Sequence, residues 1–306
     1  MHNKRYLIVV GGPTASGKTA FAIRLAKHFN THILSCDSRQ FYREMNIGTA
    51  KPTKTELKQA PHHFVDHLSI HQAYSVGDFE RDAQALLDLL FEQHPVVILS
   101  GGAGLFIKAV CEGLDEFPDV PQAIQEQLQS DYEQKGLVFL QEELARTDPD
   151  YHQQVDLQNP HRLLRALSVI RATGLPFSSF RRQESTPRSF RSIYLQMDWP
   201  REVLYERINR RVDQMLEAGL EEEARQLFPL SHLNALQTVG YQELFDHFKG
   251  GISLEEAVEL IKRNSRRYAK RQLTWLRRDG FWRLFSPSQF EQAIDYISEI
   301  LQNSEA

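Results

Sequence analysis

The sequence predicts an α/β fold, a parallel sheet core flanked by helices, with a helical insertion domain. The first observation is an apolar run, 6-YLIVV-10, which leads directly into a glycine-rich turn and a helix. The second is the alternation of short apolar runs with helical patterns over the first third of the chain, which is typical of parallel sheets with right-handed crossovers. The third is a change near residue 115, beyond which a helical pattern continues without strands.

The expected elements follow one another in chain order. The strands expected in the core are 6–10, 32–37, 95–102 and 191–199. The helices expected in the core are 17–29, 77–93, 104–113, 200–218 and 254–277. A linker, 115-DEFPDVP-121, then leads into a stretch that is helical with no strand signal. We therefore expect residues 1–114 and 186–306 to form the catalytic core and 115–185 to form the insertion.

The glycine-rich turn after the first strand fits the P-loop pattern G-x-x-x-x-G-K-[ST]. Its residues are Gly12, Pro13, Thr14, Ala15, Ser16, Gly17, Lys18 and Thr19. Backbone amides of such a loop point at phosphate oxygens, the lysine adds a positive charge, and the final hydroxyl is placed to bind Mg²⁺. Strand, turn and helix occur in the required order, so the sequence predicts a P-loop NTPase-like core that binds a phosphate compound.

The loop alone leaves the phosphate compound open, although its pattern is commonly read as ATP binding. An ATPase or kinase needs a further carboxylate, usually an aspartate that ends a neighbouring strand. Asp37 in 35-SCDSRQ-40 is a candidate metal ligand or general base, whereas 100-SGG-102 ends the other strand without a carboxylate. The structural alternative for Asp37 is a capping residue in a surface loop.

Charge is unevenly distributed along the chain, whose net charge is −4. Residues 161–191 hold seven arginines and one acid, and residues 262–278 hold eight basic residues and no acid. Concentrated basic faces attract a polyanion such as RNA even on an acidic protein. Solvated helix faces are the alternative explanation, and charge alone does not decide between the two.

The remaining sequence features narrow the class of protein. The longest apolar runs are strand-sized, so we expect no membrane partner. The first residues have no signal character and the two cysteines, Cys36 and Cys111, form no C-x-x-C, so we expect a reduced, cytoplasmic protein. The histidines of 62-HHFVDHLSIH-71 match no tight zinc-ligand spacing, and we interpret them as structural.

A series of ordered motifs resembles one family, the tRNA dimethylallyltransferases (tRNA isopentenyltransferases). The motifs are 12-GPTASGKT-19, 37-DSRQFYREMNIGTAKP-52, 61-PHHFVDHL-68, 74-YSVGDFERDA-83, 101-GG-102 with 104-GLFIKA-109, 159-NPHRLLRAL-167, 238-TVGYQEL-244 and 269-AKRQLTWLR-277. They extend through most of the chain. The resemblance implies transfer of a five-carbon dimethylallyl group from its diphosphate to N6 of the adenine just 3′ of the anticodon.

The resemblance also implies roles for individual residues. An exocyclic amine is a poor nucleophile, so a base should accept its proton, and Asp37 is the expected base. The departing diphosphate should be neutralised by the P-loop amides, Lys18 and Mg²⁺ near Thr19. The resemblance adds Thr14 and Arg211 as diphosphate contacts, so Asp37, Arg211, Thr14 and Lys18 are the expected catalytic residues. Arg211 would otherwise be one of several helix-surface arginines.

The tRNA partner implies further positions. In this family the substrates meet in a channel, whose base end should be lined by Asp37, Ser38, Arg39 and Gln40. The anticodon stem-loop should lie against the insertion at Arg162 and Arg165, and the basic segment 262–278 should bind phosphates. Tyr268 and Trp275 in that segment could stack bases, but their helical spacing favours core positions.

The sequence departs from the family pattern at a few positions. Ala103, expected near the flipped base, stands where relatives usually have Thr or Ser, so no side-chain hydroxyl is available there. Phe106 replaces a common Tyr, and Gln125, also expected near tRNA, stands where relatives often carry a basic residue. We expect a monomer with Mg²⁺ as its cofactor. The alternatives left open are an enzyme that prenylates free adenine nucleotides, a P-loop kinase for a small metabolite and a non-catalytic RNA-binding module.

Overall fold

A computed structural model describes residues 4–181, 186–278 and 280–303 of the 306-residue chain. The chain divides into two compact units, one formed by Met1–Glu112 with Arg188–Ala306 and the other by Gly113–Pro187. We call them the core unit and the insertion unit. None of the helices in the described part of the chain is long and apolar enough to cross a membrane.

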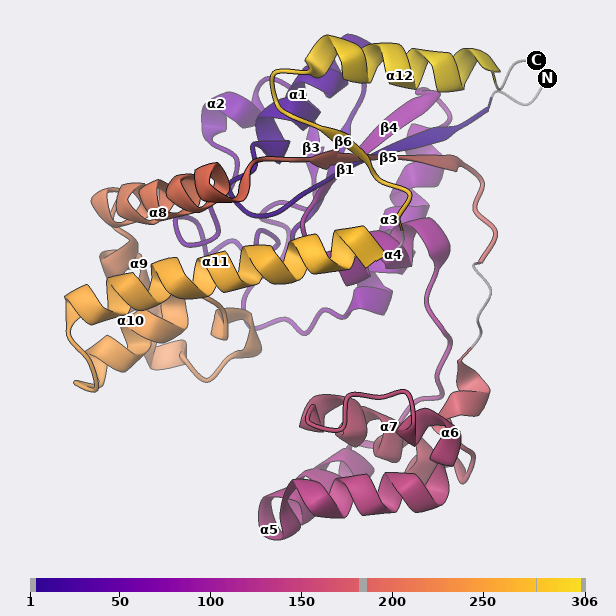
Figure 1. Cartoon of the computed structure of the whole chain (residues 1–306), viewed down its shortest axis with the longest axis vertical. Coiled ribbons are helices and arrows are strands. Elements are labelled where there is room, and N and C mark those ends of the chain that lie inside the picture. Colours follow the sequence, from indigo (N-terminus) through magenta and orange to yellow (C-terminus); the bar gives the residue numbers. More distant parts are fainter. Residues whose placement is uncertain (1–3, 182–185, 279, 304–306) are drawn as a thin grey trace. The chain divides into compact units, whose positions relative to one another are not determined.

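The core unit is built on a six-stranded sheet in the order β3-β2-β4-β1-β5-β6, in which all neighbouring strands are parallel (Figure 1). The strands are β1 (Tyr6–Gly11), β2 (Ile33–Cys36), β3 (His62–His63), β4 (Val96–Gly101), β5 (Arg191–Met197) and β6 (Arg283–Phe285). The predicted fold class is confirmed. The strand β6 is absent from the strands expected from the sequence, because three residues are too short to give a strand signal.

Helices cover both faces of the sheet because the side chains of β1 alternate between two hydrophobic clusters. Tyr6, Ile8 and Val10 face the helices α1 (Lys18–Phe29) and α12 (Phe290–Asn303). Leu7 and Val9 face the cluster that includes α3 (Val76–Leu90), α4 (Gly104–Glu112) and the long α11 (Leu254–Arg278). Figure 1 shows these two layers above and below the strands. Every residue of β1 is therefore buried.

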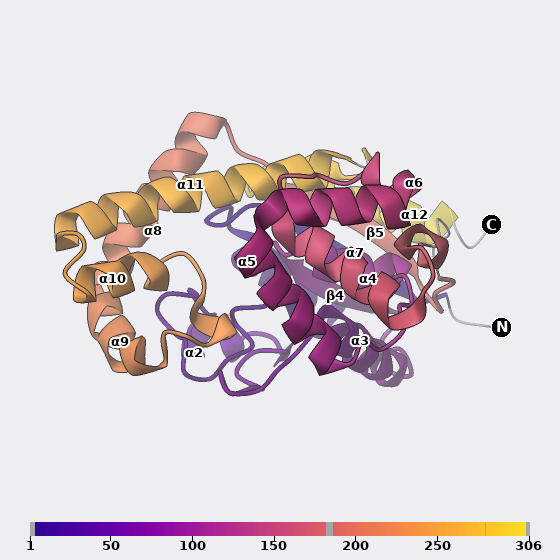
Figure 2. The same cartoon turned by 90° about the horizontal axis from the view of Figure 1, so that it is seen from below.

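The remaining core helices are α2 (Lys54–Leu57), α8 (Arg201–Glu217), α9 (Leu220–Leu227) and α10 (Tyr241–Phe248), with short 3₁₀ turns at Phe228–Leu230 and Asn234–Leu236. Of these helices, α8 and α10 pack against α11 and α9 packs against these two (Figure 2).

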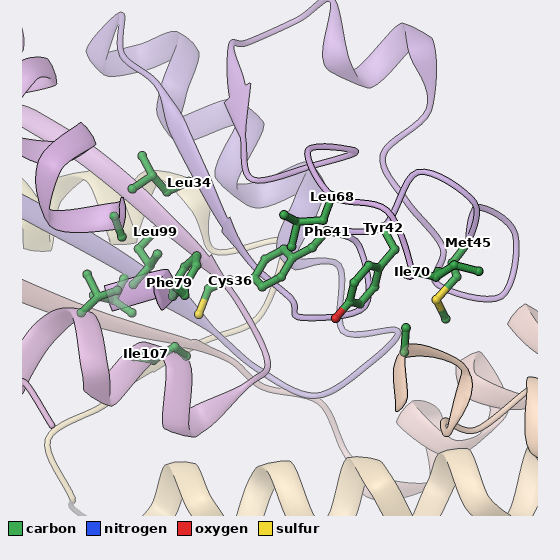
Figure 3. Packing of buried hydrophobic residues seen from close by; sticks show 14 of the residues in the cluster. Leu34, Cys36, Phe41, Tyr42, Met45, Leu68, Ile70, Phe79, Leu99 and Ile107 are labelled. Carbon is green, nitrogen blue, oxygen red and sulfur yellow. The ribbon is translucent and has the colours of Figure 1, made fainter. Parts of the chain in front are cut away.

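The loop after β2 is anchored in the core by its aromatic residues (Figure 3). Phe41 is 1% exposed and stacks on Phe79 of α3 with ring centroids 5.3 Å apart. Tyr42 and Met45 are buried in the same cluster. This packing fixes the polar residues that lie between β2 and the aromatic pair.

The insertion unit is helical, as its sequence pattern indicates. It contains α5 (Gln122–Thr147), α6 (Pro149–His152), α7 (Pro160–Thr173) and a 3₁₀ turn at Phe177–Phe180. Helix α5 is interrupted at Gly136, whose φ of 78° only glycine adopts without strain. Its small core places Leu140 and Leu144 of α5 against Leu163 and Leu167 of α7.

Candidate active site

The P-loop forms the turn between β1 and α1 at the carboxyl edge of the sheet, where ligands bind in folds of this type. Gly17 precedes α1 in the left-handed region, with φ of 89°. Lys18 and Thr19 open the helix, so its positive N-terminal end faces the loop. Lys18 Nζ donates a hydrogen bond to the carbonyl oxygen of Pro13 at 2.7 Å.

Side chains from distant elements hold the P-loop from outside. Trp199 Nε1 donates to the Ser16 carbonyl and Arg207 Nε donates to the Ala15 carbonyl, each at 2.9 Å. The guanidinium of Arg207 in turn lies 4.5 Å from the centre of the Trp199 ring. Because these two carbonyl oxygens already accept hydrogen bonds from Trp199 and Arg207, they do not repel an anion that binds in the loop.

A small pocket beside the loop brings most of the expected catalytic residues together. Thr14, Lys18, Thr19, Asp37 and Arg211 all line it. Among the described residues of its lining, Asp37 is the only acid. We call this the central pocket.

The electrostatics of the central pocket are set mainly by burial. Burial lowers the pKa of Lys18 to about 8; the Asp37 carboxylate opposes this shift and the Arg211 guanidinium adds to it. Burial also lowers the pKa of Arg211, again opposed by Asp37. Two cations thus share one carboxylate, and an incoming diphosphate would relieve their repulsion.

Two larger cavities open on either side of the central pocket. The first, about 890 Å³, is lined by the P-loop, α2 and α8; we call it the P-loop groove. Its charged lining residues include the cations Lys51, Arg207 and Arg210 and the acids Glu56 and Asp66. The second, about 450 Å³, is lined by Asp37, Tyr268 and the segment that leads into α10; we call it the Asp37 cavity. Arg211 lines all three spaces. The three spaces therefore share Arg211 as a common wall.

Asp37 is positioned by the end of β2 and by its own loop. It follows Cys36, the last residue of the strand, and its Oδ1 accepts a hydrogen bond from the Arg39 amide at 3.1 Å. The bond stabilises the turn, but no helix begins here, so Asp37 is not a helix cap. The carboxylate also lines the central pocket.

Ser38, Arg39 and Gln40, also expected to line the end of the channel that receives the adenine base, do not all lie in the same cavity. Ser38 and Arg39 line the Asp37 cavity, but Arg39 Nη1 donates to the carbonyls of Asn234 and Ala235. Gln40 is buried, and its amide nitrogen donates to the carbonyls of the loop at 49 and 50. Gln40 lines the central pocket but is largely engaged in holding this loop.

The remaining expected tRNA contacts lie at Ala103 and in the insertion unit. Ala103 precedes α4, and its carbonyl accepts the backbone amides that begin this helix. In the insertion unit, Arg162 and Arg165 are exposed on α7, with the Arg165 guanidinium 5.4 Å from the Phe117 ring centre. Gln125 lines a shallow groove on α5 and donates to the Val120 carbonyl.

Two functional candidates, Gln272 and Glu223, were not found from the sequence, and a third, Tyr268, was interpreted as a core residue. Gln272 lines the central pocket and is 7% exposed. Tyr268 is 38% exposed and lines both the central pocket and the Asp37 cavity, so its interpretation as a core residue is wrong. Glu223 of α9 accepts the backbone amides of Asn46, Ile47 and Gly48 and the hydroxyl of Tyr241, at 2.7–3.0 Å. Each is a single polar residue in a helix, and a single residue forms no sequence pattern that could identify it.

No cluster of three or more histidine, cysteine, aspartate or glutamate side chains in the described part of the chain could hold a metal ion. The hydroxyl-bearing Thr19 lines both the central pocket and the P-loop groove, next to Lys18. A cation at this position would need its other ligands from phosphate oxygens and water, which is the usual coordination of Mg²⁺ beside a P-loop. Fold and site together define a P-loop protein whose central pocket has one carboxylate, Asp37, among its described lining residues.

Comparison with known proteins identifies the family. The family model described as IPP transferase matches residues 40–279. The chain belongs to the IPP transferase family. It is 52% identical over 293 residues to the tRNA dimethylallyltransferase of Christiangramia forsetii, covering 95% of this chain and 97% of that protein. It is 49% identical over 298 residues to the tRNA dimethylallyltransferase of Cytophaga hutchinsonii, covering 97% of this chain and 98% of that one.

Solved structures show the same fold. The full-length tRNA isopentenylpyrophosphate transferase from Bacillus halodurans is 34% identical, with a TM-score of 0.74 over 99% of this chain and 98% of its own. A eukaryotic dimethylallyltransferase acting on tRNA has a TM-score of 0.85 over 98% of this chain and 80% of its own, at 24% identity. At this identity, the eukaryotic structure supports the fold of this chain only.

Proposed function

We propose that this tRNA prenyltransferase moves a dimethylallyl group from dimethylallyl diphosphate to N6 of the adenine just 3′ of the anticodon and releases diphosphate. Prenylation of tRNA follows from its family. The observation that carries the proposal is that Asp37, Lys18 and Arg211 line one pocket between two larger cavities. The pocket has a phosphate cradle on one side and a carboxylate on the other, which suits alkyl transfer from a diphosphate.

The proposed reaction forms the N6–C1 bond and breaks the bond between C1 and the diphosphate oxygen. The N6 proton passes to the Asp37 carboxylate as the new bond forms. Arg211 lies between donor and acceptor and stabilises the negative charge that develops on the leaving oxygen. Lys18, charged when the diphosphate is bound, exchanges the Pro13 carbonyl for a phosphate oxygen.

Thr19 would hold Mg²⁺ through its hydroxyl, together with diphosphate oxygens. The ion would supply positive charge to the leaving group. Thr14 lines both the central pocket and the Asp37 cavity, so its hydroxyl is placed beside the reacting centre. The cations of the P-loop groove, Arg207 and Arg210 among them, would attract the diphosphate into the cradle.

The acceptor adenine would enter through the Asp37 cavity after leaving the stack of the anticodon loop. Ser38 and Tyr268 border its path. The exposed arginines Arg162 and Arg165 of the insertion unit would bind phosphates of the anticodon stem-loop. The basic face of α11 would bind others. This arrangement favours a polymer over a free nucleotide.

One assay tests the proposal against its rivals. Labelled dimethylallyl diphosphate is incubated with Mg²⁺ and with unmodified tRNA, with AMP or with neither. We expect label on tRNA only, with no ATP requirement. Label on AMP alone would overturn the tRNA substrate. Label on neither, with ATP consumed on a metabolite, would favour a kinase.

A further inference from the structure

Arg39 joins two walls of the Asp37 cavity that are far apart in the sequence. One wall is the turn at residues 37–39, directly after β2, and the other is the segment at residues 237–240, which leads into α10. The side chain of Arg39 spans from the first wall to the start of the second. Its Nη1 donates to the carbonyls of Asn234 and Ala235, at 3.1 and 3.0 Å. These bonds connect positions that are 195 and 196 residues apart.

The two carbonyls belong to a part of the core unit that is held by packing. They lie in the 3₁₀ turn at Asn234–Leu236. Ala235 is 4% exposed, Leu236 is fully buried, and both belong to the main hydrophobic cluster of the core unit. The amides of Leu236 and Gln237 close the turn by donating to the carbonyls of Leu233 and Asn234. Arg39 therefore ties a polar loop to an anchor whose position the core determines.

The backbone of the same residue holds the Asp37 carboxylate. The Arg39 amide donates to Asp37 Oδ1 at 3.1 Å, and the Gln40 amide donates to the Asp37 carbonyl at 3.0 Å. The orientation of the carboxylate thus depends on where residue 39 lies. The bonds from the Arg39 side chain to the 3₁₀ turn determine that position.

A phosphate contact is the other role open to Arg39, since the end of the channel that receives the base is expected to meet tRNA. Arginine binds phosphate through a planar fork of N–H groups. Here Nη1 is engaged with two neutral carbonyls of the protein, and the residue as a whole is half-buried. A phosphate that used this nitrogen would have to displace both carbonyls, so the geometry favours a role within the protein.

We propose that Arg39 is a positioning residue for the transfer step: its amide orients Asp37, and its side chain holds the two walls of the Asp37 cavity at a fixed separation. The inference rests on the proposed function, in which Asp37 accepts the N6 proton. A displacement of about 1 Å at a reacting group can cost about 10²-fold in rate, so a tie of this kind acts on the chemical step. Affinity for tRNA, which phosphate contacts dominate, does not depend on it.

The test uses the full-length protein with dimethylallyl diphosphate, Mg²⁺ and unmodified tRNA. Arg39→Met keeps the aliphatic stem and the backbone amide but removes both side-chain bonds. We expect it to slow single-turnover transfer about 10- to 100-fold. Arg43→Met is the matched control, because Arg43 is an exposed arginine of the same loop that also donates to a backbone carbonyl, that of His67. Arg43 is not among the described residues that line the Asp37 cavity, so this variant should transfer at the wild-type rate.

Two further measurements separate positioning from the other roles. Arg39→Met should keep the wild-type salt slope of tRNA binding, and a slope reduced by about one would show a phosphate contact and overturn the inference. In the free protein, the amides of Leu236 and Gln237 should exchange hydrogen faster in Arg39→Met than in wild type or Arg43→Met. Unchanged exchange or an unchanged transfer rate would likewise overturn it. Transfer that is equally fast in wild type and in Asp37→Asn would instead overturn the base of the proposed function, whatever the Arg39 variant shows.

Discussion

Gln272 accepts a hydrogen bond from the Thr14 amide at 2.9 Å, across a separation of 258 residues. Its amide nitrogen donates to the Gly102 carbonyl, also at 2.9 Å. One side chain of α11 therefore joins the P-loop to the carboxyl end of β4. A Cβ at Gly102 would lie 2.2 Å from Gln272 Nε2, so the bridge also requires glycine at position 102.

Replacing Gln272 should disturb the position of the P-loop relative to β4 and leave the affinity for tRNA unchanged. We expect Gln272→Leu, which keeps the volume and removes both bonds, to lower kcat about 10- to 100-fold because it leaves a part-buried amide and a part-buried carbonyl unpaired. The Kd for tRNA should stay unchanged. Steady-state kinetics measures the effect, and Gln226→Leu, at an exposed position of α9, is the matched control. A lowered melting temperature with normal kcat would show that the bridge serves stability alone.

The Asp37 carboxylate is expected to act on the chemical step. Asp37→Asn retains an oxygen that accepts the Arg39 amide but cannot take the N6 proton. Single-turnover transfer should slow by about 10²- to 10⁴-fold. Binding of tRNA, measured separately, should be nearly unchanged. Comparable losses of transfer and binding would instead assign Asp37 to the folding of its loop.

The lowered pKa of Lys18 should appear in the pH dependence of donor binding. Because burial lowers this pKa to about 8, the free protein holds a charged Lys18 below that pH and a neutral one above it. Affinity for dimethylallyl diphosphate should therefore fall as pH rises through about 8, by up to tenfold per unit. Calorimetric titration between pH 6.5 and 9.5 measures it. Lys18→Arg should move the decline to higher pH, since arginine stays charged.

The arginines of the insertion unit should act through phosphates. Charge reversal at Arg162 and Arg165 should weaken tRNA binding and reduce its salt slope by about one for each phosphate that the variant no longer neutralises. Arg146→Glu changes the same charge at an exposed position of α5 and serves as the control. An unchanged slope in the double variant would remove α7 from the tRNA surface.

Local patterns in the sequence predicted the sheet core and the phosphate cradle. Strand, glycines and helix adjoin in the P-loop, and Asp37 follows its strand directly, so interactions within a few residues suffice. Gln272 and Glu223 could not be found in this way, because their partners lie 258 and about 176 residues away. The interpretation of Tyr268 was wrong because helical spacing does not say which face of α11 is covered.

Glu223 affects where an anion can bind beside the P-loop groove. Three successive amides, at Asn46, Ile47 and Gly48, form a nest of the kind that traps phosphate oxygens, and two of these residues border the P-loop groove. The carboxylate of Glu223 already occupies these three amides. A diphosphate that entered the groove would therefore find this nest filled by an anion of the protein itself.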